Sequence, residues 1–253
     1  MLLSILTCVK SDTSDLAVTY ESLLPFLCPE MGWIIKYSQH CSTAFVDSIP
    51  VNSYIKKIQS EDFGLYEGLN QALNVCESKY YAVLGAGDGL LQEGFWSGLS
   101  EMDAAPEMDA YFFACKLNLS GRIFTPKVED LTFRMSCPHP SSILKVHNSK
   151  EIGGFNTSYE IASDYDHICR YTNKFQNYKA SSIVIALFKG GGISDVRTFE
   201  AALEEELIRI RIFKSHDLAV RGRLLANCAA NISSVLAQSF RRTPDPSKMQ
   251  ATD

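Results

Sequence analysis

The chain has 253 residues, of which 46% are hydrophobic and 21% are charged, and its formal net charge is −5. This length suffices for one large α/β domain or two small ones with a sizeable core. The negative balance gives no overall attraction to nucleic acid, and the longest apolar runs are far too short to span a membrane. A nucleic-acid-binding protein and an integral membrane protein are therefore not expected.

The eight cysteines occur singly, and no two of them have Cys-x-x-Cys spacing. Most lie within apolar runs, where a thiol packs as a small hydrophobic group, so a zinc site is not expected. The apolar segment 1–9 lacks a basic flank and is followed by Lys10, Ser11 and Asp12. We interpret it as a buried strand and not as a signal peptide, and we expect a cytoplasmic protein.

The first sixty residues alternate between strand and helix patterns. The pattern predicts strands over 2–9, 33–35 and 54–59, a helix from Leu16 to about Leu27, and a loop over 40–50. A strand–helix–strand order with short connections is typical of a doubly wound α/β sheet.

The stretch from Asp62 to Gly89 carries the clearest pattern in the chain. Four apolar residues recur at helical spacing, which predicts a helix with one buried face: Leu65, Leu69, Leu73 and Cys76. The apolar run 80–84 then predicts a buried strand, which ends in the glycine-rich loop Gly85-Ala86-Gly87-Asp88-Gly89. Ligands of open α/β sheets bind at the carboxyl ends of the strands, and Asp88 is delivered to that edge.

The second half continues the alternation. The pattern predicts helices over 92–103, from Asp164 towards Tyr171, from 198 and over about 218–240; strands over 109–115, 142–146 and 182–188; a hairpin at 122–125; a rigid loop at 136–142; and a flexible loop at 189–194. Residues 243–253 are polar and proline-containing, which predicts a disordered tail.

The ordered set of motifs resembles the family 2 glycosyltransferases of the GT-A fold, which build bacterial surface polysaccharides. The resemblance rests on Asp62-Phe63-Gly64-Leu65-Tyr66, a helix that contains Asn70, an apolar strand and a Gly87-Asp88 ending. It covers about residues 1–197 and implies a Rossmann-like, mixed and mainly parallel sheet flanked by helices. Residues 198–242 would then form a C-terminal helical extension of this nucleotide-sugar domain.

The resemblance implies a donor site. Asp88 would hold Mg²⁺ or Mn²⁺ at the diphosphate of a nucleotide sugar, although an aspartate in a turn is the alternative. Asp62 and Gly64 would lie at the nucleoside, although Asp62 could instead cap the following helix. Asn70 would face the donor or be an ordinary polar helix residue.

Two further positions are implied near the donor. His139, between two prolines, would lie near the phosphates or the acceptor, or would be structural. Lys189 and the Gly190-Gly191-Gly192 run resemble a loop that closes over the donor, and a plain connector is the alternative.

Asp164 is the candidate catalytic base. An inverting transfer needs a carboxylate that removes the proton of the acceptor hydroxyl, and the family has an acid at the start of a helix. Ala162-Ser163-Asp164-Tyr165-Asp166 fits this pattern, with Asp166 and Glu160 as substitutes for Asp164. Helix capping is the alternative interpretation.

The sequence departs from the family in two places. Many relatives have an acid after the second strand, where this chain has Lys36-Tyr37-Ser38-Gln39-His40, and the loop that ends in Asp88 has one acid where the family often has two. The sequence therefore does not determine the donor nucleotide, and UDP is the default prediction.

Three hypotheses follow. The first is an inverting, metal-dependent transferase that moves a sugar to a glycan or lipid-linked acceptor. The second is a catalytically inactive relative that binds a nucleotide or a partner, and the third and weaker one is a nucleotidyltransferase. The C-terminal helices carry seven cations against Asp217 between residues 209 and 242, so they could rest on the inner face of an anionic membrane, pack on the sheet, or pack on a second copy in a homo-oligomer.

Overall fold

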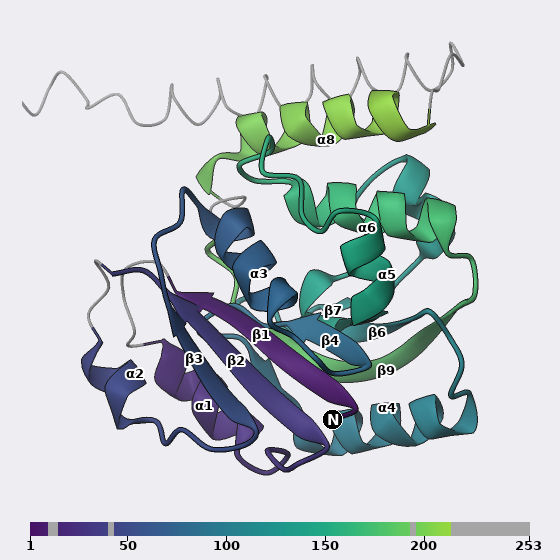
Figure 1. Cartoon of the computed structure of the whole chain (residues 1–253). Helices are drawn as coiled ribbons and strands as arrows, with labels where there is room; N and C mark the ends of the chain where they lie inside the picture. Colours follow the sequence, from purple (N-terminus) through teal and green to yellow (C-terminus); the bar gives the residue numbers. More distant parts are fainter. Residues whose placement is uncertain (10–14, 40–42, 193–195, 214–253) are drawn as a thin grey trace, which may run out of the picture.

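The computed structural model describes residues 1–9, 15–39, 43–192 and 196–213. In this part of the chain nine strands form one mixed sheet in the order β3-β2-β1-β4-β8-β6-β9-β5, and β7 pairs with β6 (Figure 1). The strands are β1 Leu3–Val9, β2 Met31–Tyr37, β3 Ile55–Gln59, β4 Tyr80–Val83, β5 Gly89–Leu90, β6 Ala110–Leu117, β7 Ile123–Phe124, β8 Ser142–Lys145 and β9 Tyr178–Phe188. The helices are α1 Leu16–Leu23, α2 Ala44–Ser48, α3 Leu65–Asn74, α4 Gln92–Ala104, α5 Val146–Glu151, α6 Ser163–Lys174 and α8 Thr198–Phe213, with the 3-10 helices η1 Val128–Thr132 and η2 His139–Ser141.

Six strands run in the same direction. β3, β2, β1 and β4 are parallel neighbours, whereas β8 is antiparallel to both β4 and β6, so β6 and its parallel neighbour β9 share the direction of β4. The carboxyl ends of β1, β4, β6 and β9 therefore meet at one edge of the sheet. The fold class predicted from the sequence, a mixed and mainly parallel sheet between helices, is confirmed.

The sheet separates two hydrophobic cores because side chains of a strand alternate between its faces. In β4, Tyr80 and Ala82 pack in the core under α1 and α4, whereas Tyr81 and Val83 pack in the core with α3, α5 and α6. β6 follows the same alternation. Helices cover both faces, as Figure 1 shows, so β2 and β4 are buried along their whole length and β1 and β6 along most of theirs, whereas β3 and β9 are partly exposed.

The loop predicted over residues 40–50 is partly wrong. Residues 44–48 form the short helix α2, whose Val46 is fully buried in the core under α1. Five residues are too few to show a helical repeat in the sequence, and packing of Val46 supplies the stabilisation that propensity does not. β5, of two residues, and α5, of six, are also short and are likewise absent from the sequence prediction.

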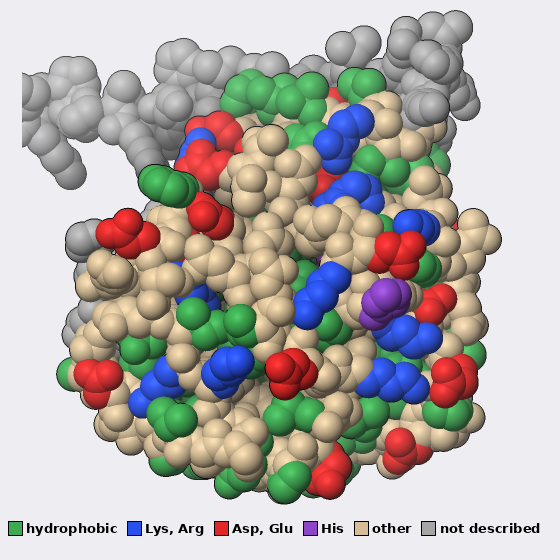
Figure 2. Space-filling view, viewed as in Figure 1, with side chains coloured by type: hydrophobic (Ala, Val, Ile, Leu, Met, Phe, Trp, Pro, Cys, Tyr) green, Lys and Arg blue, Asp and Glu red, His purple; other side chains and the backbone are tan. Residues whose placement is uncertain are grey.

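The helix α8 packs across α6, at the top of Figure 1. Its inner side buries Ala201 and Ile208, and its outer side leaves the apolar stripe Phe199, Leu203, Leu207 and Ile210 between 43% and 53% exposed. Figure 2 shows these hydrophobic side chains gathered along the top of the molecule. The second helix predicted over 218–240 and the tail 243–253 lie outside the described residues. Within the described ranges, no helix is both long enough and apolar enough to cross a bilayer.

Candidate active site

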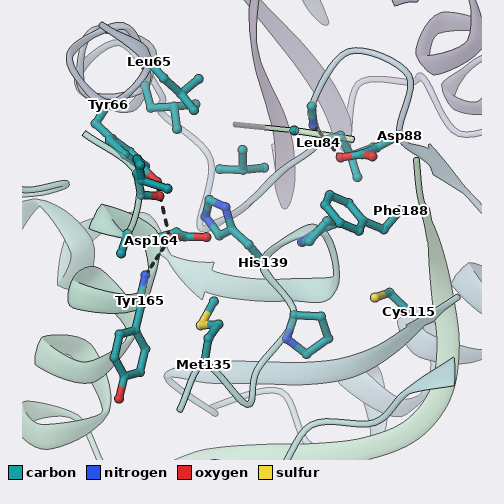
Figure 3. A pocket seen from close by; sticks show the side chains of 18 of the residues that line it. Leu65, Tyr66, Leu84, Asp88, Cys115, Met135, His139, Asp164, Tyr165 and Phe188 are labelled. Carbon is teal, nitrogen blue, oxygen red and sulfur yellow. Dashed lines mark hydrogen bonds between the residues drawn. The ribbon is translucent and has the colours of Figure 1, made fainter. Parts of the chain in front are cut away.

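A pocket of about 500 Å³ opens at the edge where the strands end (Figure 3). The strands contribute Cys8 from β1, the end of β4, Cys115 and Leu117 from β6, and Phe188 from β9. The helices contribute the first turns of α3 and α6 and one side of α8. Of the residues predicted from the sequence, the pocket brings together Asp88, His139 and Asp164 (Figure 3).

Asp88 is held rigidly by the backbone around it. Its two carboxylate oxygens accept hydrogen bonds from the backbone N–H of Gly85 at 2.9 Å and of Lys189 at 2.8 Å, and the residue is 4% exposed. Gly87 has a φ of 96°, and a side chain there would collide with Lys189. The turn therefore requires glycine at this position, and it holds the Asp88 carboxylate just beyond the carboxyl end of β4.

Burial raises the pKa of Asp88 from 3.8 to about 6, although both backbone N–H donors and Lys189 act in the opposite direction. The folded chain therefore holds this proton up to about pH 6, whereas the unfolded chain releases it near pH 4. The contribution of this group to stability consequently falls as the pH rises through that window and is constant above it.

We expect this titration to be visible in the metal-free protein. With EDTA present, the free energy of unfolding of the wild type relative to Asp88→Asn should fall by about 2–3 kcal/mol between pH 4 and pH 7, from about 1.4 kcal/mol for each unit of pKa shift. Urea denaturation of both proteins across this range measures the difference. A difference that does not change with pH would show that Asp88 ionises normally.

Asp164 lies in the first turn of α6 and faces the pocket. Its Oδ1 accepts hydrogen bonds from the backbone N–H of Tyr165 at 2.8 Å and from the hydroxyl of Tyr66 at 3.3 Å, drawn as dashed lines in Figure 3. Tyr66 also donates to the carbonyl oxygen of Ile161 and is itself buried. One carboxylate oxygen is thereby oriented by α3 and α6 together.

The two substitutes for Asp164 are placed differently. Asp166 is fully buried and forms ion pairs with Arg170 at 2.7 Å and with Arg211 of α8. Glu160 pairs with Arg197 and does not line the pocket. A catalytic base must be able to reach the substrate. Of these three acids, only Asp164 lines the pocket.

The turn before α6 is held by the C-terminal helix. Both oxygens of the Glu204 carboxylate accept hydrogen bonds from consecutive backbone N–H groups, those of Glu160 at 2.9 Å, Ile161 at 2.9 Å and Ala162 at 2.8 Å. Charge-assisted bonds of this kind are stronger than neutral ones. α8 therefore positions the segment that carries Asp164.

Glu204→Gln should weaken this anchorage, because an amide accepts with one oxygen where the carboxylate accepts with two. We expect a loss of about 1–3 kcal/mol in the free energy of unfolding, the range for hydrogen bonds to a charged group. Glu200→Gln, an exposed change on the same helix, is the control and should stay within about 0.5 kcal/mol of the wild type. Equal effects of the two substitutions in urea denaturation would contradict the anchoring role.

His139 lines the pocket beside Asp164, and its Nε2 is buried with no hydrogen-bond partner among the described residues. Burial lowers the pKa of His139, while the charge of Asp164 acts in the opposite direction. A neutral imidazole with an unused nitrogen is therefore available at neutral pH to a polar group in the pocket.

Asp62 does not line the pocket. Its carboxylate pairs with Lys36, whose side chain is fully buried in β2, and accepts the N–H of Gly64 at 3.3 Å. The Lys36 ammonium also donates to the Ser60 carbonyl at 2.9 Å. Lys36 therefore ties Asp62 to the sheet.

Asn70 and the Lys189 side chain also lie outside the pocket. The amide of Asn70 exchanges two hydrogen bonds of 2.8 Å with the backbone of Phe155. The Lys189 ammonium pairs with Asp15, while its backbone N–H supports Asp88. From the loop that follows, Gly192 reaches the pocket lining.

Glu205 of α8 is a pocket residue that sequence reasoning missed. It pairs with Arg209 at 3.2 Å, and burial together with the nearby charge of Asp164 raises its pKa. The signal in the sequence is the acidic triplet 204–206 within an apolar helix, but only the docking of α8 on α6 shows which acid faces the pocket.

The pocket carries three carboxylates, those of Asp88, Asp164 and Glu205, and no lysine or arginine among the described residues that line it. No group of three or more His, Cys, Asp or Glu side chains in the described ranges forms a complete metal site. Asp88 fits the role of a single protein ligand, because hard divalent cations are commonly held by one or two carboxylates together with substrate phosphates.

No protein-family model matches the chain, and neither does any curated protein. Solved structures do match. S. aureus TarS has a TM-score of 0.65 at 14% identity, over 90% of this chain and 43% of the TarS chain. TarS 1-349 in complex with UDP-GlcNAc gives the same score and identity, over 90% of this chain and 72% of that one.

Two further structures come from other organisms. A mannosyltransferase from Pyrobaculum calidifontis, in complex with GDP-Man and Mn²⁺, has a TM-score of 0.58 at 11% identity, over 94% of this chain and 79% of its own. Glucosyl-3-phosphoglycerate synthase from Mycobacterium tuberculosis, in complex with Mn²⁺, UDP and phosphoglyceric acid, has a TM-score of 0.58 at 10% identity, over 82% and 78%. At these identities the likeness concerns the fold: this chain has the GT-A fold of nucleotide-sugar glycosyltransferases.

Proposed function

We propose that the protein is an inverting, metal-dependent glycosyltransferase. The observation that carries this proposal is the charge of the pocket, which holds three carboxylates and no lysine or arginine among its described lining residues. Arg209 offsets the charge of Glu205, but the carboxylates of Asp88 and Asp164 would still repel a nucleoside diphosphate, because like charges at close range repel in a partly buried environment. Asp88 would hold a divalent cation, which would supply the missing positive charge for the leaving diphosphate.

Asp164 is the proposed base. As the acceptor oxygen forms its bond to the anomeric carbon, Asp164 takes the hydroxyl proton, and the bond to the donor diphosphate breaks on the opposite face. Tyr66 and the Tyr165 N–H orient Oδ1 and leave the other carboxylate oxygen for the proton. His139 is neutral and lies close enough to Asp164 to bond a donor phosphate or the acceptor.

The other residues predicted at the donor do not contact it with their side chains in this proposal. They hold the surrounding backbone in place. Asp62 and Gly64 shape the turn at the nucleoside end of α3, with the Asp62 charge neutralised by Lys36. Asn70 secures that helix to the Phe155 loop, and Lys189 supports Asp88 while the glycine loop after it covers the donor. In this proposal residues 1–197 are the transferase domain and residues 198–242 its C-terminal extension, whose described part, α8, holds the turn before Asp164.

The donor and acceptor follow from likeness and not from the site. The structural neighbours are described with UDP, UDP-GlcNAc and GDP-Man, so a nucleotide sugar, with UDP as default, is the proposed donor. Glycan or lipid-linked hydroxyl groups in surface-polysaccharide synthesis are the proposed acceptors. A cytoplasmic location at the inner membrane face, with membrane or subunit contact through the C-terminal helices, belongs to the same proposal.

The test is release of the nucleoside diphosphate from a panel of UDP- and GDP-sugars with Mn²⁺ or Mg²⁺. We expect the wild type to consume one of these donors, and we expect EDTA to prevent this by removing the divalent cation. Asp88→Asn should lose this turnover, because Asp88 is the proposed metal ligand. Asp103→Asn, an exposed change in α4, is the matched control and should retain full turnover. Binding of a donor without turnover, by correctly folded protein and with a range of acceptor sugars, would favour the catalytically inactive alternative.

A further inference from the structure

A second pocket of about 350 Å³ adjoins the candidate active site. It lies between the β7 hairpin and the segment 127–136. Phe124 and Met135 line both pockets, so these two side chains form the wall that the pockets share. β7 pairs with the end of β6, at Cys115 and Lys116, and β9 takes the other edge of β6 there, so β7 continues the edge that β8 occupies further back.

The second pocket is basic, and we call it the basic pocket. Arg122, Lys127 and Arg134 line it, together with the hydroxyl residues Thr125 and Ser136 and the apolar Ile123, Phe124 and Met135. No acid lines it among the described residues, but Asp130 in the same segment pairs with Arg134 at 2.6 Å. Two cations, Arg122 and Lys127, and the Thr125 hydroxyl thus remain for a ligand, and such groups are the donors that phosphate and carboxylate groups bind.

The frame of the basic pocket is built before any ligand binds. The backbone N–H of Lys127 donates to the carbonyl of Ser136 at 3.0 Å, and the Ser136 hydroxyl donates to the carbonyl of Lys127 at 2.6 Å. These two bonds close the segment 127–136 on itself. Leu131 within it is buried and its carbonyl accepts the hydroxyl of Tyr165, the neighbour of Asp164. The segment is therefore tied to the helix that carries the proposed base.

The two pockets have opposite charge. The active-site pocket is lined by three carboxylates, whereas the basic pocket is lined by three cations. The Asp164 carboxylate would repel a negative group of an acceptor, unless that group lies beyond the Phe124–Met135 wall. We propose that the basic pocket binds an anionic group of the acceptor, a phosphate or a carboxylate, while a hydroxyl of the same acceptor reaches Asp164. This inference rests on the proposed sugar transfer and assigns it an anionic acceptor.

Binding of the anion can be measured without any sugar transfer. The probes are glycerol 3-phosphate, glycerate and glycerol, and the reporter is the methyl NMR signal of Met135 in the full chain, identified by its loss in Met135→Leu. We expect saturable shifts with one or both anions and none with glycerol; the anion that binds more tightly identifies the class. Affinity should fall as the ionic strength rises.

The double variant Arg122→Gln/Lys127→Gln should weaken binding of the anion by about tenfold or more, because each removes a charge-assisted bond. Lys56→Gln, an exposed lysine on β3 at the far edge of the sheet, is the control and should bind as the wild type. Equal binding of glycerol and the anions, or no loss in the double variant, would overturn the proposal.

A second measurement separates this inference from the proposed function. Calorimetric binding of UDP with Mn²⁺ should be unchanged, within about twofold, in the double variant. A parallel loss of UDP affinity would assign the basic pocket to the donor and overturn the acceptor site. If UDP fails to bind the wild type while glycerol 3-phosphate still binds the basic pocket, the proposed transferase function fails but the anion site stands.

Discussion

Asp164→Asn is expected to lower kcat by about 10²–10⁴-fold, the contribution typical of a positioned general base. The amide keeps the shape of the side chain, and its oxygen can still accept the Tyr165 N–H, but it cannot take a proton. The KM for the donor should therefore stay within about twofold. Initial rates of diphosphate release, measured for wild type and variant with the same donor and Mn²⁺, test this expectation.

Asp166→Asn is the matched control, because it changes the same group two residues further along α6. Asp166 is buried between Arg170 and Arg211, so its substitution should lower the stability of the fold, with turnover per folded molecule largely retained. If Asp164→Asn turned over normally while Asp166→Asn did not, the assignment of the base would be wrong.

Lys36→Met is expected to lower the free energy of unfolding by about 3–5 kcal/mol, the range for removing one partner of a buried ion pair. The Lys36 side chain is 0% exposed and that of Asp62 is 7% exposed. Little water can therefore solvate the negative charge of Asp62 once Lys36 is removed. Urea denaturation at neutral pH measures this change.

The second substitution Asp62→Asn, made in the Lys36→Met background, should recover part of the loss, because the uncompensated charge is then gone. Lys56→Met, an exposed lysine on the adjacent strand, should change stability by no more than about 0.5 kcal/mol. A loss below about 1 kcal/mol in Lys36→Met would show that the pair contributes little.

The stretch from Asp62 to Gly89 was predicted well from the sequence because its signals are local. Helical spacing places Leu69 and Leu73 in the core as predicted, although Leu65, predicted on the same face, is 42% exposed, and the glycines that follow β4 form the turn that presents Asp88. α6 begins at Ser163, one residue before the predicted start, but the roles proposed for Asp88 and Asp164 came from the resemblance and not from these local patterns.

The parts that sequence reasoning missed depend on contacts between distant segments. Alternation in β2 puts Lys36 on a buried face, but nothing local identifies Asp62, 26 residues later, as its partner. Glu204 and Glu205 lie about forty residues after Asp164, and only the packing of α8 on α6 brings one to the backbone of the base segment and the other into the pocket. The basic pocket likewise forms only when β7 pairs with β6.

The central claim is that Asp88 binds a nucleotide donor through a divalent cation, in a pocket with no lysine or arginine of its own among the described lining residues. Calorimetric titration of UDP into the protein, with Mn²⁺ and with EDTA, tests this most directly. The account predicts binding that requires Mn²⁺, is lost in Asp88→Asn and persists in Asp164→Asn. Equal affinity with EDTA, or unchanged Mn²⁺-dependent binding in Asp88→Asn, would contradict it.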